Sequence, residues 1–127
     1  MRLEVEQGLE RSRRELEAAE ALLRQEFFEQ AISRAYYACF YAAEMALLSL
    51  GETRSKHSGV LSAFGRRVIR EGGLQAEMGE LLRSLFEDRI DADYRFIGAP
   101  PGRARERIDD ARRFVEAVRE WIEKRDR

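Results

Sequence analysis

Polar side chains that could bind or react follow one line of a strongly apolar stretch. Residues 30 to 51 read QAISRAYYACFYAAEMALLSLG, and within them Arg34, Tyr37, Tyr41 and Glu44 follow one another at spacings of three, four and three. In a helix these spacings place the four side chains in one line. The line either packs in the interior with its hydroxyls hydrogen-bonded or faces a partner or ligand.

Arg89 is the charge that fits its local pattern least well. A helix expected from about Gln75 to Asp91 has one apolar face, and Arg89 continues that face. A guanidinium in such a position needs a carboxylate or a ligand anion beside it. Asp93, one helical turn on, or Glu44 can supply a structural ion pair. Alternatively, Arg89 is a ligand-binding or catalytic residue, with Asp93 and Tyr94 beside it.

A basic segment precedes this helix. Residues 53 to 70 contain five lysines or arginines and no acid: Arg54, Lys56, Arg66, Arg67 and Arg70. A third helix, expected from about His57 to Arg70 and capped by Thr53 or Ser55, would add the partial positive charge of its first amides. Arg54, Lys56 and His57 are therefore candidates for an anion or phosphate site. A solvated helix face is the other interpretation.

Several kinds of chemistry are disfavoured by residue type. One histidine and one cysteine are too few for a zinc site, and the sequence has no serine-hydrolase, P-loop or dinucleotide motif. We therefore expect no metal, no cofactor and no conventional enzyme. Because Arg54, Lys56 and a positive helix end surround His57, its imidazole should be neutral at pH 7. Cys39 lies mid-helix and should be a buried structural thiol.

These candidates need a helical scaffold to position them. Periodicity predicts helices at about 2–25, 30–51, 57–70, 75–91 and 103–124, and no segment alternates like a strand. The 30–51 helix is apolar on every side, so other helices must surround it. We predict a single all-α domain over residues 1–127. Its expected architecture is an antiparallel up-and-down bundle of four long helices and one shorter helix.

Composition narrows the setting. The net charge is -1, so any nucleic-acid contact must be local. The longest apolar run, Ala35 to Ala43, is shorter than the roughly 20 residues that span a bilayer, and the N-terminus is not a signal peptide. We expect a cytoplasmic protein without membrane contact. The many arginines alternate with acids, which favours ion-pair networks of a heat-adapted protein, although genome composition can give the same excess.

Three ordered segments carry a family resemblance. SRAYYACFYAAEMALLSLG, then KHSGV followed by Phe64 and Gly65, then LFEDRIDADY precede a closing amphipathic helix. From about Gln30 to Trp121 the chain resembles the HEPN domain in its small single-domain form. This resemblance implies a helical bundle that dimerises and is paired with a nucleotidyltransferase-fold protein in a toxin-antitoxin-like system.

The resemblance also implies a candidate reaction. Many HEPN proteins are toxins that cleave RNA without metal, using an arginine and a histidine four to six residues apart. Here His57 follows Arg54 by three positions, and Arg89 is followed by Asp93 and Tyr94 instead of a histidine.

Two functions therefore stay open. We favour a non-catalytic, homo-oligomeric module that binds a nucleotide and a nucleotidyltransferase-fold partner. Its expected nucleotide or anion contacts are Arg34, Tyr37, Arg54, Lys56, His57, Arg89 and Asp93. The alternative is an RNA-cleaving toxin that uses Arg89 with Tyr94 or His57.

Overall fold

The computed structural model describes residues 1–126, and these fold entirely as helices and loops, with no strand among them. The elements in chain order are α1 (Leu3–Arg24), α2 (Phe28–Ser49), α3 (His57–Phe64), η1 (Gly65–Arg70), α4 (Ala76–Tyr94) and α5 (Pro101–Arg125). The predicted all-α class is confirmed, and the predicted helix boundaries agree with the observed ones to within about three residues.

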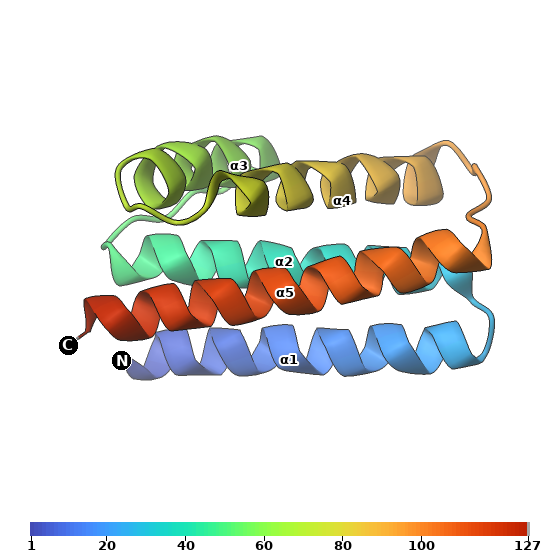
Figure 1. Cartoon of the computed structure of the whole chain (residues 1–127), viewed down its shortest axis with the longest axis horizontal. Coiled ribbons are helices and arrows are strands. Elements are labelled where there is room, and N and C mark those ends of the chain that lie inside the picture. Colours follow the sequence, from blue (N-terminus) through green and yellow to red (C-terminus); the bar gives the residue numbers. More distant parts are fainter. Residues whose placement is uncertain (127) are drawn as a thin grey trace.

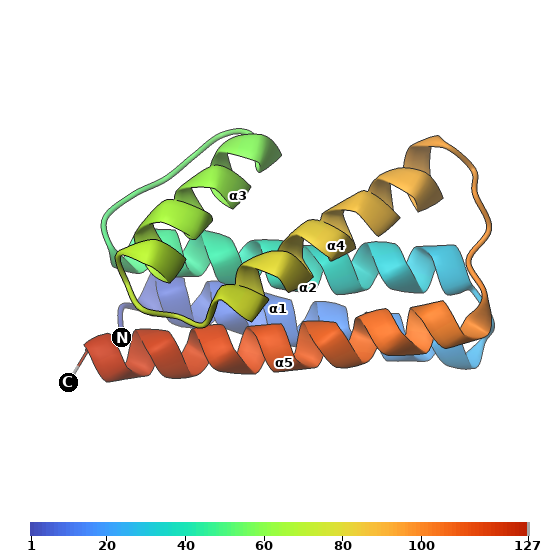
Figure 2. The same cartoon turned by 45° about the horizontal axis from the view of Figure 1, so that its top comes forward.

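The four long helices run up and down the bundle (Figure 1). The helices α1, α2 and α5 lie side by side, while α3 and α4 form a layer across them and diverge from each other when the molecule is turned (Figure 2). Both termini lie at the same end. The α1–α2 turn and the α4–α5 loop lie at the opposite end.

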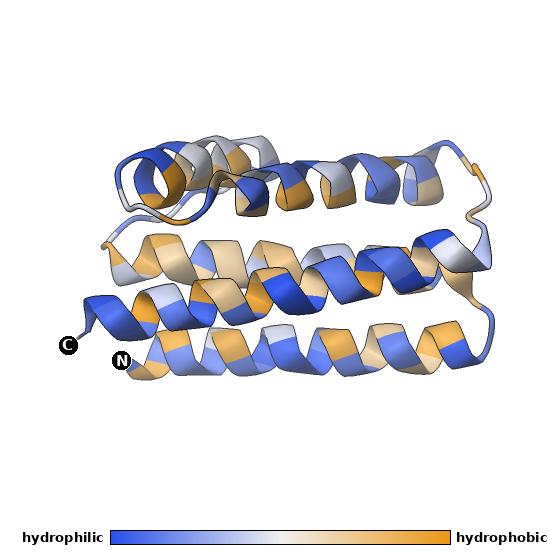
Figure 3. Ribbon diagram, viewed as in Figure 1, coloured by the Kyte–Doolittle hydropathy of each residue, from blue (hydrophilic) through white to orange (hydrophobic). Residues whose placement is uncertain are grey.

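The central position of α2 follows from its sequence. Six of its alanines are buried, which lets neighbouring helices approach closely, and Tyr36 and Leu47 are also in the core. The outer helices turn their apolar stripes inward and their charged faces outward (Figure 3). Gly51 follows α2 with φ of +80°, the left-handed conformation expected at a helix end. Cys39 is buried, as predicted.

The third helix differs from its prediction in two ways. It is α-helical only to Phe64 and continues as a π-helical turn, η1. In a π-helix each N–H donates to the carbonyl five residues earlier instead of four. Lys56 occupies the N-cap position without a side-chain cap, so the prediction that Thr53 or Ser55 caps this helix is wrong. After η1, the Trp121 indole Nε1 donates to the Gly72 carbonyl at 2.8 Å and ties the turn to α5.

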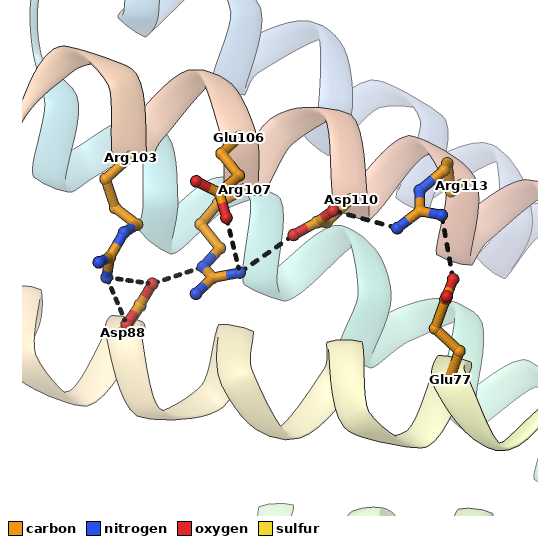
Figure 4. Close-up of polar contacts among 7 residues, drawn as sticks. All are labelled: Glu77, Asp88, Arg103, Glu106, Arg107, Asp110 and Arg113. Atoms are coloured by element: carbon orange, nitrogen blue, oxygen red, sulfur yellow. Dashed lines mark hydrogen bonds and ion pairs between the residues drawn. The ribbon is translucent and has the colours of Figure 1, made fainter.

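A line of ion pairs fastens α4 to α5 (Figure 4). Asp88 accepts from Arg107 Nε at 2.6 Å and from Arg103 at 3.4 Å. Arg107 continues to Asp110 at 3.0 Å, and Arg113 links Asp110 to α4 again. This arrangement matches the predicted ion-pair networks. Asp88 immediately precedes Arg89, so these contacts fix the part of α4 that carries Arg89.

Two further properties bear on function. None of the helices in residues 1–126 is long and apolar enough to cross a membrane. Within the same residues, no group of three His, Cys, Asp or Glu side chains converges as metal ligands.

Candidate functional site

Arg89 lies in an aromatic enclosure on the inner face of α4. Its side chain is buried, with the residue 4% exposed. The guanidinium carbon lies 4.9 Å from the ring centre of Tyr36, 5.4 Å from Phe86, and 5.6 Å from Tyr37 and Tyr94. The negative faces of these rings replace part of the lost hydration of the cation. Arg89, which continues the apolar face of its helix in the sequence, is thus also surrounded by aromatic side chains in the fold.

The polar contacts of Arg89 are few and long. One terminal nitrogen lies 3.9 Å from the Asp93 carboxylate and 3.5 Å from the Tyr94 hydroxyl, while Nε is buried without a hydrogen-bond partner. Asp93 also accepts from the Ser33 hydroxyl at 3.3 Å. The sequence left two counter-ions open, and the structure selects Asp93. Among residues 1–126 Glu44 forms no ion pair with Arg89; it lines a small cavity beside Arg54 instead.

His57, at the first position of α3, meets Arg89 across the site. Its Nδ1 lies 3.3 Å from the other terminal nitrogen of Arg89 and 3.0 Å from the Tyr36 hydroxyl. The imidazole stacks on Phe40 with ring centres 4.0 Å apart. Because a guanidinium can only donate, Nδ1 must accept, and the proton of neutral His57 is therefore on Nε2.

The electrostatic prediction for His57 is correct in direction but not in cause. The pKa of His57 is lowered from its ordinary value, first by burial and then by the Arg89 charge. The sequence had assigned this effect to Arg54, Lys56 and the helix end. The actual cation comes from another helix, so only the fold could identify it.

Tyr36 is a site residue that the sequence reading missed. It is completely buried, and burial raises the pKa of its hydroxyl well above the ordinary value, so the hydroxyl stays neutral. The line of polar residues predicted from the sequence runs through Tyr37, one residue further along α2. The signal was available: Ser33 and Tyr36 are three residues apart, and both point from α2 toward the Arg89 cluster through their contacts with Asp93 and His57.

Arg34 and Tyr37, two of the binding candidates from the sequence, border this cluster in a half-exposed position. The Arg34 guanidinium carbon lies 4.8 Å from the Tyr37 ring centre. Tyr37 in turn presents its ring edge-on to His57, with centres 5.8 Å apart. Arg34 also pairs with Glu15 of α1 at 3.2 Å. Glu15 is buried, and nothing in the sequence reading had distinguished it from the many exposed glutamates.

The structure does not bring the other basic candidates into the cluster. Arg54 donates to Glu52 at 2.9 Å and to the Thr53 carbonyl at 2.8 Å. Arg67 pairs with Glu52 and Glu71, the acids that flank the basic segment. Lys56 is exposed beside His57. Within residues 1–126 it forms no ion pair and no side-chain hydrogen bond with the residues of the Arg89 cluster. The acids that flank the segment therefore pair with two of its five cations, Arg54 and Arg67.

The cluster is built to hold an anion more than to remove a proton. The Nδ1 lone pair of His57 is used within the protein, and Nε2 makes no hydrogen bond with another residue of the described chain. A ligand at that edge of the half-exposed ring meets an N–H donor. Arg89 adds charge behind it, and Lys56 lies next to it in the chain.

Comparison with known proteins gives the family and the fold. The sequence profile described as "HEPN domain" matches residues 5–125. A "UPF0332 protein" of Thermotoga maritima is 35% identical over 94% of this chain and 91% of its own length. "Putative toxin MJ0142" of Methanocaldococcus jannaschii is 37% identical over 72% of this chain and 62% of its own length.

The solved structure of TT1696 from Thermus thermophilus superposes with a TM-score of 0.76. The superposition covers 92% of this chain and 97% of that one at 22% identity, and so it bears on the fold.

Proposed function

Because the chain belongs to the HEPN domain family, we propose that it is the HEPN member of a toxin-antitoxin-type pair, acting as a helical binding module. In this role it assembles with itself, binds a nucleotidyltransferase-fold partner, and holds the phosphate of a nucleotide or RNA at Arg89 and His57. The toxin name of the Methanocaldococcus relative supports the biological setting. The geometry of the two side chains supports the chemistry.

The contact between Arg89 and His57 carries this proposal. The two residues come from different helices, and both are constrained by aromatic rings rather than by strong ion pairs. Asp93 approaches Arg89 only to 3.9 Å, so much of the charge of the guanidinium is not spent in a close salt bridge. The guanidinium therefore keeps charge that attracts an oxyanion to the half-exposed edge of His57 in front of it.

The proton position favours binding over catalysis. A general base needs a lone pair directed at the proton it removes. In His57 the lone pair on Nδ1 is directed at Arg89 and Tyr36, while Nε2 carries the proton. Proton abstraction would first require the imidazole to change tautomer and break its contact with Arg89. Binding a phosphate oxygen requires no such change.

One observation favours the second candidate function, a metal-independent endoribonuclease. HEPN ribonucleases pair an arginine with a histidine, and here Arg89 and His57 meet in space although they lack the usual sequence spacing. In that mechanism Arg89 would stabilise the charge that develops on the phosphate, and His57 would move the 2′-hydroxyl proton. Tyr94, at the end of α4, lies beside Arg89 as an alternative proton donor.

One experiment separates the two functions. Purified protein is titrated with 5′-UMP by calorimetry and incubated with a labelled single-stranded RNA in EDTA. The binding function predicts a calorimetric signal that is lost in Arg89→Gln and kept in Arg83→Ala, an exposed arginine on the same helix, with the RNA left intact. RNA cleavage that depends on both Arg89 and His57 would instead establish the ribonuclease. No UMP binding by the parent protein would refute the nucleotide site.

Self-association is supported by the exposed apolar residues beside the site. Tyr94, Phe96 and Ile97 are largely exposed, with Phe96 88% exposed, and they adjoin the α4 segment that carries Arg89. Monomers seldom leave several large apolar side chains together in water. A second copy that covers them would also shield the Arg89 cluster from solvent. The nucleotidyltransferase-fold partner is tested separately, by co-purification with the protein encoded next to this chain.

A further inference from the structure

We propose that a ladder of arginines and tyrosines on α1 and α2 is a stacking surface for the bases of single-stranded nucleic acid. This Arg-Tyr ladder consists of Arg11, Tyr41, Tyr37 and Arg34. The inference rests on the proposed function in one respect, because the ladder adjoins the phosphate site at Arg89 and His57. It extends that function by giving the ligand several nucleotides in place of one.

The ladder has two adjacent rings on α2 with one arginine at each end, Arg11 from the neighbouring helix α1 and Arg34 from α2. The guanidinium carbon of Arg11 lies 5.1 Å from the Tyr41 ring centre, and that of Arg34 lies 4.8 Å from the Tyr37 ring centre. The two tyrosine rings are 5.9 Å apart. A guanidinium that lies over a ring keeps its outer face available, and nucleobases stack on such planes as they do on aromatic rings.

Glu15 fixes the two guanidinium groups. Its buried carboxylate accepts from Arg11 Nε at 3.1 Å and from Arg34 at 3.2 Å. A buried carboxylate between two helices is costly unless it is paired, and Arg11 and Arg34 supply that pairing. One carboxylate faces two guanidinium groups, which leaves the ladder positively charged. Arg14 lines the same open cavity of about 370 Å³ as Arg11 and Glu15 and adds another cation.

The ladder is continuous with the proposed phosphate site. The Tyr37 ring centre lies 4.8 Å from the guanidinium carbon of Arg34 and 5.6 Å from that of Arg89. A strand whose phosphate sits at Arg89 would therefore place its neighbouring bases next to Tyr37 and Arg34. Aromatic and cationic groups along one path are the combination that binds single strands without sequence preference.

The charge of the ladder favours nucleic acid over a protein as its occupant. Each of the two half-buried rings has an arginine over it, and a single carboxylate pairs with both cations, so a negatively charged occupant fits this surface better than a neutral one. Arginine planes stack on bases and their edges bind phosphates, so one residue type serves both parts of a nucleotide.

The test compares an oligomer with a mononucleotide. Binding of fluorescent eight-residue oligo-U and oligo-dU is measured by anisotropy, with 5′-UMP as competitor, in the whole chain. We expect the oligomers to bind at least about tenfold more tightly than UMP, and Arg11→Ala and Tyr41→Leu each to weaken oligomer binding by about tenfold. UMP affinity should be unchanged in both variants. Because stacking uses the base, the two oligomers should bind within about threefold of each other.

The matched control is Arg13→Ala. Arg13 lies on α1 with a side-chain exposure of 53%, close to the 60% of Arg11, but it pairs with Glu10 and Glu17. Within residues 1–126 its guanidinium lies over no aromatic ring. The Arg13→Ala substitution removes the same charge from the same helix as Arg11→Ala. Oligomer binding should nevertheless stay within about twofold of the parent. Equal losses in Arg11→Ala and Arg13→Ala would overturn the ladder, since only general charge would then matter.

Other outcomes also decide the question. Oligomers that bind no more tightly than UMP, or a large preference for one sugar, would remove the base-stacking role while leaving the Arg89 site in place. If Arg11→Ala changed the number of protein chains that associate but bound oligo-U as the parent does, the ladder would be a protein–protein interface. Oligomer binding that depends on Arg11 and Tyr41 in the absence of any UMP binding would keep the ladder and refute the nucleotide site.

Discussion

The guanidinium of Arg89 lies 3.3 Å from Nδ1 of His57, although the two residues are 32 positions apart in the chain. This contact determines the tautomer of the histidine, because the arginine can only donate. The Arg89 charge helps to lower the pKa of His57. In return, His57 supplies one of the few hydrogen-bond acceptors of Arg89.

Replacing Arg89 with alanine should cost about 2 kcal/mol of unfolding free energy, measured by urea denaturation. The substitution removes a buried cation from four aromatic rings, which is the destabilising part. The Asp93 side chain is 32% exposed, so water can solvate the carboxylate that is left. The loss should therefore stay below the 3 to 5 kcal/mol typical of a broken buried pair. An unchanged midpoint, or a loss in that larger range, would contradict this account of Arg89.

Stability should fall as the pH is lowered from 7 to 5, in part because of His57. The folded-state pKa lies below the ordinary value of 6.5, so the unfolded chain takes up a proton at higher pH than the folded chain does. The stabilisation is fully present above pH 6.5 and is lost as the pH falls through the folded pKa. In His57→Gln, whose amide oxygen can still accept from Arg89, this pH dependence should be weaker. Parent and variant curves of equal slope would contradict it.

Gly72→Ala should destabilise the turn between η1 and α4 by about 2 kcal/mol. A Cβ there would lie 2.6 Å from the Val68 carbonyl oxygen and 2.7 Å from the Trp121 ring, and the backbone oxygen cannot move aside. Gly65→Ala is the matched control, since nothing lies within 4 Å of its Cβ position and its φ of -58° is helical. That change should be neutral or slightly stabilising. Equal thermal midpoints for the two variants would refute the steric argument.

Phe96→Asp should convert the proposed dimer to a 14.8 kDa monomer in sedimentation experiments at micromolar concentration. The side chain is almost fully exposed in the single chain, so the change costs little folding stability but would place a charge inside an interface. Leu3→Asp serves as control, because Leu3 is also exposed but lies at the start of α1. A parent protein that sediments only as a monomer would contradict self-association directly.

Much of the fold was predictable because local patterns and tertiary packing agree. The continuous apolar wheel of α2 requires burial on all sides, and Gly51 marks its end. The π-helical turn at Gly65–Arg70 was not predictable, because its residues read as an ordinary amphipathic helix. The turn that follows it is held by Trp121, a contact across 49 positions that no local pattern encodes.

Several residues of the site could be identified from the sequence, but the contacts between them could not. Arg89 could be identified because a charge interrupts an apolar face, and Asp93 because it lies one turn away. That His57 would face Arg89 depends on the angle between α3 and α4, which no local pattern encodes. For the same reason Arg54 was grouped with His57 from sequence proximity, whereas its guanidinium bonds to Glu52. Tyr36 could be placed on the face of Ser33 from their spacing, but its contact with His57 is revealed only by packing.

The most direct test of the central claim is a long-range ¹H–¹⁵N NMR spectrum of the single histidine during titration with 5′-UMP. Before titration at pH 7, the spectrum should show neutral His57 with the proton on Nε2. Addition of UMP should shift the Nε2 resonance in the parent protein and leave it unchanged in Arg89→Gln. A proton on Nδ1, or a spectrum that UMP does not change, would contradict the proposal that Arg89 and His57 together hold a phosphate.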